Sequence, residues 1–207
     1  MEQTRRIDYA SAALSFSDKL SCMRNLIFGI NLSLDGCCDH TKLGPDEEVH
    51  EYFTQLLRDV DVLVYGRKTY ELMVPFWPDV AKNHSAPTEA MNDFAEAFDA
   101  SKIVVFSQSL EQAEGENTRI VRTNLEDEIL KLKQQPGKDI LTGGVSLPSQ
   151  LIELGLIDEY RFVVHPFVVG EGRRLFDDVS LPEKLQLRLV ESKVFKSGCV
   201  ALRYLKQ

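Results

Sequence analysis

Two cationic residues stand where a strand is expected to end and a helix to begin. Arg67 and Lys68 follow an apolar strand expected over residues 60–65 and the glycine Gly66, and Thr69 comes next. The first turn of a helix already carries partial positive charge on its free N–H groups. Two cations are unfavourable there unless an anion is bound among them. Gly66, Arg67, Lys68 and Thr69 are therefore candidate phosphate-binding residues.

Two further strand ends carry residues of the same kind. Ser107 and Gln108 follow the apolar run KIVVF, and Thr142 precedes Gly143-Gly144 at the start of a helix that carries no charge until Glu153. Ligands of open α/β sheets bind beyond the carboxyl ends of the strands, and glycine lets the backbone approach them closely. Each piece alone is commonly a plain turn or a solvated surface. Together, in this order, they favour a pyrophosphate site.

Other nucleotide-binding patterns are missing from the sequence. Neither GxGxxG nor GxxxxGK[ST] occurs, and Gly170-Glu171-Gly172 lacks the third glycine and is predicted to lie in a loop. The four cysteines have no metal-ligand spacing, and no HxE or PCxxC pair is present. We therefore expect no metal site.

The candidates for substrate contact are Asp35, His50 and Trp77. Asp35 follows the first expected strand and is a candidate proton donor or substrate anchor. A carboxyl group at that task would need a raised pKa. Alternatively, Asp35 is only the first residue of an Asp-Gly turn. His50 lies on a helix flank, where partial exposure is the competing interpretation. Trp77, in a proline-broken loop expected over residues 74–86, either covers a pocket or simply packs.

Strands and helices alternate along the chain until the last 25 residues. Strands are expected over residues 24–33, 60–65, 102–106, 119–121, 139–141 and 160–165, with helices over 45–59, 67 onward, 88–99, 125–135 and 145–155. Residues 185–195 and 199–206 alternate between apolar and polar and predict an antiparallel hairpin. The fold class is therefore α/β: three α/β/α layers around a mixed, mostly parallel sheet that ends in this hairpin.

Composition limits the class of partner. The chain has 207 residues and a net charge of −8, which argues against nucleic acid or an anionic membrane as a partner. Its cysteine usage and the lack of an apolar run of about 20 residues suggest a cytoplasmic protein. Residues 1–22 have neither helix nor strand periodicity and are expected to be a poorly ordered extension, so residues 23–207 form the single predicted domain.

Five segments resemble the dihydrofolate reductase-like family, in particular the C-terminal reductase domain of bifunctional riboflavin-biosynthesis proteins and its stand-alone relatives. The resemblance covers about residues 24–205, and it is carried by FGINLSLDG, VLVYGRKTYE, KIVVFSQSL, DILTGGVSLPSQLIELGLIDEY and VVHPFVVGEGRRLF. It implies an NADPH site and a small-molecule substrate, and relatives of this kind often form homodimers.

The resemblance also implies a role for each candidate residue. Gly66 to Thr69 would hold the adenosine-side phosphates, with Arg67 and Lys68 facing the 2′-phosphate, and Thr142, Gly143, Gly144, Val145 and Ser146 would bind the pyrophosphate. Ser107 and Gln108 would lie beside the adenine ribose, and Arg122 near the adenine. Many relatives have arginine where Gln108 stands. His50 occupies the place of the acidic residue that anchors the pterin in dihydrofolate reductases, whereas Asp35 matches an aspartate in the substrate pocket of the riboflavin-type enzymes.

The leading hypothesis is an NADPH-dependent oxidoreductase that transfers hydride to a small heterocyclic or imine-like substrate, such as a pteridine or pyrimidinone of riboflavin or folate metabolism. The alternative is a non-catalytic NADP(H)-binding protein with a sensing or assembly role. A domain without any cofactor is the third hypothesis.

Overall fold

One eight-stranded sheet forms the centre of the molecule. The computed structural model describes residues 23–44, 46–115 and 117–207. The strands lie in the order β4-β3-β2-β5-β1-β6-β8-β7. All neighbours from β4 to β6 are parallel, whereas β8 is antiparallel to both β6 and β7. The strand bounds are β1 Leu26–Ser33, β2 Val60–Gly66, β3 Lys102–Phe106, β4 Thr118–Val121, β5 Asp139–Thr142, β6 Glu159–His165, β7 Leu187–Val194 and β8 Val200–Lys206.

Helices fill the connections between the parallel strands. Their bounds are α2 Glu47–Asp59, α3 Arg67–Met73, α4 Trp77–Asn83, α5 Glu89–Asp99, α6 Leu125–Gln134 and α7 Ser146–Glu153. The predicted caps are present, since the side chains of Thr88 and Asn124 accept hydrogen bonds from the backbone N–H groups of Met91 and Asp127. Asp46 caps α2 in the same way. These side chains satisfy N–H groups that the first turn leaves free.

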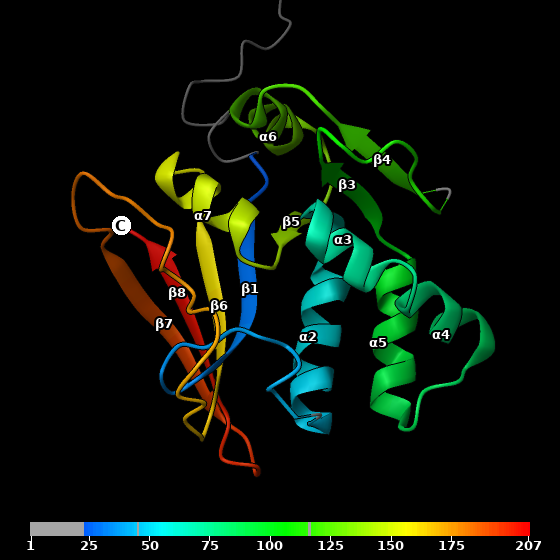
Figure 1. Ribbon diagram of the computed structural model, residues 1–207, viewed down its shortest axis with the longest axis vertical. Helices are drawn as coiled ribbons and strands as arrows, with labels where there is room; N and C mark the ends of the chain where they lie inside the picture. Colours follow the sequence, from blue (N-terminus) through cyan, green and yellow to red (C-terminus); the bar gives the residue numbers. More distant parts are fainter. Residues whose placement is uncertain (1–22, 45, 116) are drawn as a thin grey trace, which may run out of the picture.

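Two apolar cores lie on opposite faces of the sheet. On one face, Phe28 and Val64 pack with residues of α6 and α7. On the other, Leu63 packs with residues of α2, α3 and α5. Successive side chains of a strand point to opposite faces, so β2 contributes to both cores. Figure 1 shows α2 and α5 side by side, away from α6 and α7. The predicted three-layer α/β/α fold is confirmed.

The C-terminal hairpin extends the sheet at its β6 edge. Ala201 and Phe195 pack with Val49 of α2 and Val163 of β6 in a third, smaller core. Along β7, by contrast, Leu189 and other apolar side chains are exposed. The predicted antiparallel hairpin is confirmed, and β7 is the edge strand of the sheet.

The segment around Trp77 differs from its prediction. The sequence predicted a loop over residues 74–86, but Trp77–Asn83 is the helix α4. Pro78 lies in its first turn, where a proline removes an N–H group that has no intrahelical partner anyway. The helix predicted from residue 45 begins at Glu47, and Pro45 itself lies outside the described residues, as does the extension predicted over residues 1–22.

The parallel strands bring their carboxyl ends to one edge of the sheet. Gly66, Phe106 and Thr142, which end β2, β3 and β5, therefore lie along the same edge, with Ser33 and His165 at the ends of β1 and β6. Among the described residues, no helix is long and apolar enough to cross a membrane.

The strand that leads to Gly66 gives the first prediction. Leu63→Ala removes a fully buried side chain from β2 and should lower the free energy of unfolding by about 2–5 kcal/mol. Leu189→Ala is the matched control, because this leucine also lies on a strand but is 50% exposed, and it should cost less than about 1 kcal/mol. Urea denaturation measures both values. Equal losses would contradict the burial that we assign to β2.

Candidate functional site

A cleft of about 1410 Å³ runs along the carboxyl edge of the sheet. Its walls come from the ends of β1, β2, β3, β5 and β6, from the starts of α3 and α7, and from the inner faces of α2 and α5. The cleft therefore lies where ligands of open α/β sheets bind. Most of the residues singled out in the sequence line it: Gly66, Arg67, Lys68, Thr69, His50, Trp77, Ser107, Gln108, Thr142, Gly143, Gly144, Val145 and Ser146.

The junction of β2 and α3 places both predicted cations on the cleft. The first turn of α3 contains no acidic residue, and no side chain caps it. Arg67 has partners elsewhere: its Nε donates to Glu71 Oε1 at 2.6 Å and its Nη1 donates to Ser109 Oγ at 2.8 Å. The Arg67 and Glu71 side chains are each nearly half exposed, so their ion pair contributes little stability. An anion can therefore compete for the Arg67 guanidinium.

The junction of β5 and α7 lies directly against that of β2 and α3. The Thr142 hydroxyl donates to the Val64 carbonyl at 2.8 Å and ties β5 to β2. Gly144 has a φ of +83°, and a Cβ at this position would lie 2.1 Å from Thr69 Oγ1. Only glycine allows this approach, because it has no side chain and adopts positive φ without strain. The start of α7 also lacks an acidic residue and a side-chain cap.

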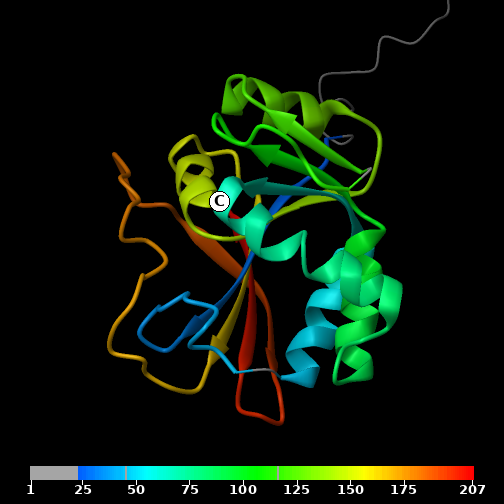
Figure 2. The ribbon, with the colours of Figure 1, turned by 45° about the vertical axis from the view of Figure 1, so that its right-hand side comes forward.

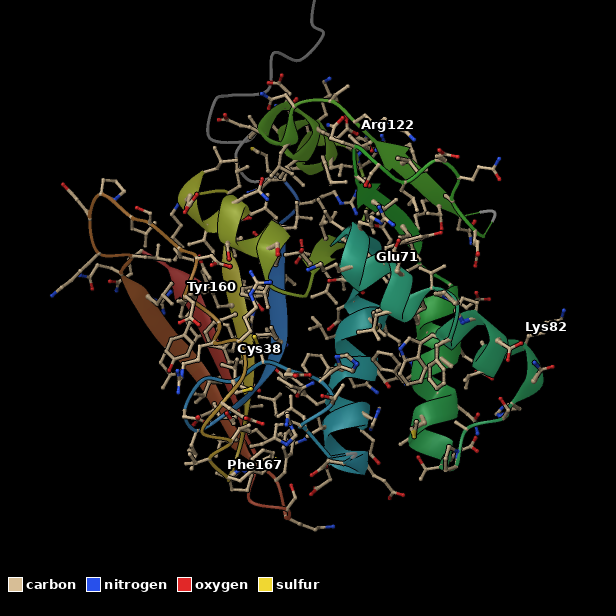
Figure 3. All side chains as sticks on the ribbon, viewed as in Figure 1. Cys38, Glu71, Lys82, Arg122, Tyr160 and Phe167 are labelled. Carbon is tan, nitrogen blue, oxygen red and sulfur yellow. The ribbon has the colours of Figure 1, made fainter. Side chains whose placement is uncertain are left out.

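The β3 and β4 end of the cleft contains Ser107 and Gln108. The Ser107 hydroxyl accepts hydrogen bonds from the N–H groups of Ser109 and Leu110, at 3.2 and 2.9 Å, and closes a turn. Gln108 donates to the Arg122 carbonyl at 3.0 Å. The Arg122 side chain donates to the Leu110 carbonyl and is not among the residues that line the cleft. Figure 3 shows Arg122 in the upper part of the molecule, well separated from Cys38, which does line the cleft.

Aromatic side chains form the wall on the α2 and α5 side. The Trp77 ring lies 4.6 Å from that of Phe94, and the His50 ring lies 6.4 Å from Trp77 and 6.0 Å from Phe94. His50 Nδ1 is 2.8 Å from the Asp46 carbonyl oxygen. The cleft is lined by all four of these residues: Trp77, Phe94, His50 and Asp46. This wall suits a planar ligand, which can stack on or pack edge-on against the rings.

A buried polar cluster beside this wall was not found from the sequence. His165 is 4% exposed, with Nδ1 3.4 Å from Cys199 Sγ and Nε2 3.3 Å from Asn31 Oδ1. Burial lowers the pKa of His165, so the imidazole is neutral at neutral pH. Asp46 Oδ2 lies 3.8 Å from the same sulfur atom. From the sequence, His165 was predicted to end a strand, with facing the cofactor as the weaker alternative, and Asp46 was predicted to lie in the first turn of the helix expected over residues 45–59.

The Asp46 carboxylate is held in its ionised form. Partial burial alone would raise its pKa, but hydrogen bonds from Ser197 and from the N–H groups of Val49 and Glu48 outweigh it and lower the pKa. Asp46, His165 and Asn31 all line the cleft. Together they offer hydrogen-bonding groups next to the aromatic wall.

Asp35 does not line the cleft in the described structure. Its carboxylate accepts hydrogen bonds from the Ser33 hydroxyl at 2.6 Å and from the N–H groups of Val169 and Gly170 at 3.1 and 3.0 Å. These bonds hold the pKa of Asp35 well below its ordinary value. The prediction of a raised pKa, which a proton donor would need, is therefore wrong, because each hydrogen bond to the carboxylate stabilises its ionised form. Its role as a substrate anchor stays a prediction.

Comparisons with known proteins match most of the chain to one family model and to a curated relative. The family model described as RibD C-terminal domain matches residues 24–201. The uncharacterized protein YyaP of Bacillus subtilis (strain 168) is 36% identical over 190 residues, which are 87% of this chain and 94% of YyaP.

Solved structures with the same fold are more distant in sequence. A putative riboflavin biosynthesis protein from Shewanella sp. PV-4 has a TM-score of 0.67 at 22% identity, over 89% of this chain and 99% of its own. Dihydrofolate reductase from Enterococcus faecalis, solved as a complex with NADP(H), has a TM-score of 0.57 at 16% identity, over 88% of this chain and 96% of its own. These two structures show the shared fold.

The contact between Gly144 and Thr69 can be tested by substitution. Gly144→Ala should lower the free energy of unfolding by about 1–3 kcal/mol more than Gly198→Ala, because its Cβ meets Thr69 Oγ1. Gly198 is a suitable control: its φ is +87°, but the nearest atom to a Cβ there, on Pro166, is 3.4 Å away. Both variants carry the same backbone strain. Equal losses in urea denaturation would mean that α3 and α7 do not meet as described.

Proposed function

The chain belongs to the RibD C-terminal domain family, a family of reductase domains, and from this membership we propose that it is an NADPH-dependent oxidoreductase acting on a small heterocyclic or imine-like substrate. The observation that carries the proposal is the meeting of two helix starts without acidic residues, at Thr69 and Gly144, in one cleft. Two such starts provide the free N–H groups and positive potential that suit a pyrophosphate.

The residues of the cleft fit a dinucleotide phosphate in their chemistry. Gly144 lets the backbone before α7 approach Thr69 of α3 closely, since a Cβ at this position would clash with Thr69 Oγ1, and the N–H groups of Val145 and Ser146 lie at the start of α7. Arg67 and Lys68 supply positive charge at the neighbouring helix start, where they suit a 2′-phosphate. Ser107 and Gln108 follow along the same edge and suit a ribose. The Enterococcus faecalis dihydrofolate reductase, which shares the fold, was solved with NADP(H).

The other half of the cleft suits the substrate. When bound, NADPH would supply the hydride. The rings of His50, Trp77 and Phe94 would pack against a planar heterocycle and exclude water from it. Asp46, ionised at neutral pH, would accept hydrogen bonds from ring N–H groups rather than donate a proton. A pteridine or pyrimidinone-like ring has the shape and polarity that these groups require.

The position of Trp77 provides a direct binding assay. It is the only tryptophan of the chain and it lines the cleft, so NADPH should change its fluorescence in a saturable way. Lack of a saturable change up to millimolar NADPH would contradict the proposal. Oxidation of NADPH should then be screened with pterins, pyrimidinones and quinones. Binding without any turnover would favour the non-catalytic NADP(H)-binding alternative.

Arg67 should discriminate between the two nicotinamide cofactors. Arg67→Glu places a negative charge beside the expected 2′-phosphate, and we expect it to weaken NADPH binding by about tenfold or more while NADH changes much less. Arg188→Glu makes the same charge change on the exposed strand β7, away from the cleft, and should leave both affinities unchanged. Dissociation constants from Trp77 fluorescence test this. An equal loss for both cofactors would place Arg67 away from the 2′-phosphate.

A further inference from the structure

The segment of residues 169–178, which we call the crossing segment, is tied to the loop that follows β1. The Arg173 carbonyl accepts a hydrogen bond from the Cys38 N–H at 3.0 Å, and the Leu175 N–H donates to the Gly36 carbonyl at 3.1 Å. Lys42 and Glu171 form an ion pair at 2.8 Å. In Figure 2 the two segments, orange and blue, lie in the same part of the molecule beyond the ends of β6 and β1. The backbone of Arg173 is thereby fixed.

Asp35 is a central link between the two segments. Its two carboxylate oxygens accept from the N–H groups of Val169 and Gly170, at 3.1 and 3.0 Å. Its backbone carbonyl accepts from Arg174 Nε at 3.0 Å. Charge-assisted hydrogen bonds of this kind are stronger than neutral ones. Asp35 therefore holds the crossing segment at its start and again beside Arg173.

Because the crossing segment is held in this way, Arg173 lines the cleft at the start of α7. Its Nη1 donates to Ser146 Oγ at 3.1 Å, and its Nη2 forms an ion pair with Asp178. The side chains of Arg173 and Asp178 are 39% and 60% exposed. A cation from a distant part of the sequence thus lies at the first residue of the helix that was expected to hold the pyrophosphate.

Two interpretations of this arginine compete. It is either a brace between Asp178 and Ser146 or a ligand-binding cation that Asp178 holds in place. An exposed ion pair contributes little stability, so a phosphate group can displace Asp178 at small cost. The guanidinium has five N–H donors in a planar arrangement that matches phosphate oxygens. Arg173 also lines the cleft, so a ligand in the cleft can reach these donors. Both interpretations account for the contact with Ser146, but the second also explains why Arg173 lies in the cleft at a helix start without an acidic residue.

We infer that Arg173 binds the pyrophosphate of the dinucleotide and that Asp35 is the residue that positions it. The inference rests on the proposed function, because it uses the same cofactor. It adds a cation from outside the strand ends to the cofactor site. It also gives Asp35 a task that agrees with its contacts, at a distance from the reacting atoms.

The first test compares cofactor affinities of single variants. Arg173→Ala should weaken NADPH and NADH alike, by about tenfold each, because both contain the pyrophosphate. It should leave the affinity for 2′-AMP, which lacks a pyrophosphate, unchanged. Arg173→Lys retains the charge without the fork and should lie between wild type and alanine. Arg119→Ala is the matched control: Arg119 is exposed and ion-paired with Glu128, and it does not line the cleft.

The second test shows whether Asp35 acts through Arg173. Asp35→Asn removes the charge that holds Val169 and Gly170, so it should weaken both cofactors several-fold in the wild-type background. In the Arg173→Ala background the same substitution should have little further effect. A purely structural role would give additive losses and would also weaken 2′-AMP. Thermal unfolding of each variant identifies those that fail to fold, and these are replaced by Asp35→Glu and Arg173→Lys.

The outcomes separate this inference from the proposed function. If wild type binds NADPH and Arg173→Ala binds it equally well, the inference is wrong and the proposed function stands. If only the KM of a phosphorylated substrate rises in Arg173→Ala, the arginine binds the substrate and the inference is again wrong. A selective loss of NADPH or 2′-AMP would place Arg173 on the 2′-phosphate. Wild type that binds neither cofactor would overturn both proposals.

Discussion

The close approach of Gly144 to Thr69 is the constraint on which the part of the cleft between α3 and α7 depends. With a φ of +83°, Gly144 turns the chain from β5 into α7 with no atom between its Cα and the Thr69 hydroxyl. The hydrogen bond from Thr142 to Val64 fixes the strands on which both junctions stand. The starts of α3 and α7 therefore face one space. Any side chain at Gly144 would separate them, and the free N–H groups would no longer converge.

Charge is distributed unevenly along the cleft even though the protein carries a net charge of −8. Arg67, Lys68 and Arg173 lie beside the two helix starts, whereas Asp46 and the aromatic rings lie at the α2 side. Local fields decide where an anion binds, so the overall acidity of the protein does not conflict with a phosphate site. The same separation leaves the α2 side of the cleft with aromatic rings, a neutral imidazole and a carboxylate. A phosphate group is favoured at one end and a neutral or N–H-rich ring at the other.

The residues that the sequence could locate are those whose position follows from a strand end. Gly66 and Gly143 each follow an apolar run, and parallel strands bring such ends together, so the fold and the meeting of these residues in one cleft were predictable. Trp77 was placed in a loop because Pro78 was taken as a helix breaker rather than as a first-turn residue. Arg173, and the polar partners of His165, were missed for another reason. Their positions depend on contacts with residues more than 100 positions away, such as Cys38 and Asn31, which no local pattern encodes.

Asp35 shows how an accurate local prediction can lead to the wrong chemistry. The Asp-Gly turn after β1 exists, but the carboxylate faces the crossing segment and accepts three hydrogen bonds. Protonation of either carboxylate oxygen would disrupt the hydrogen bonds to that oxygen and weaken those to the other, so the ionised form is strongly favoured. A group held in this way cannot supply a proton near neutral pH. Reduction of an imine-like bond would need its proton from another source, and the contacts of Asp35 suit it to hold the crossing segment, and Arg173 with it, at the cleft.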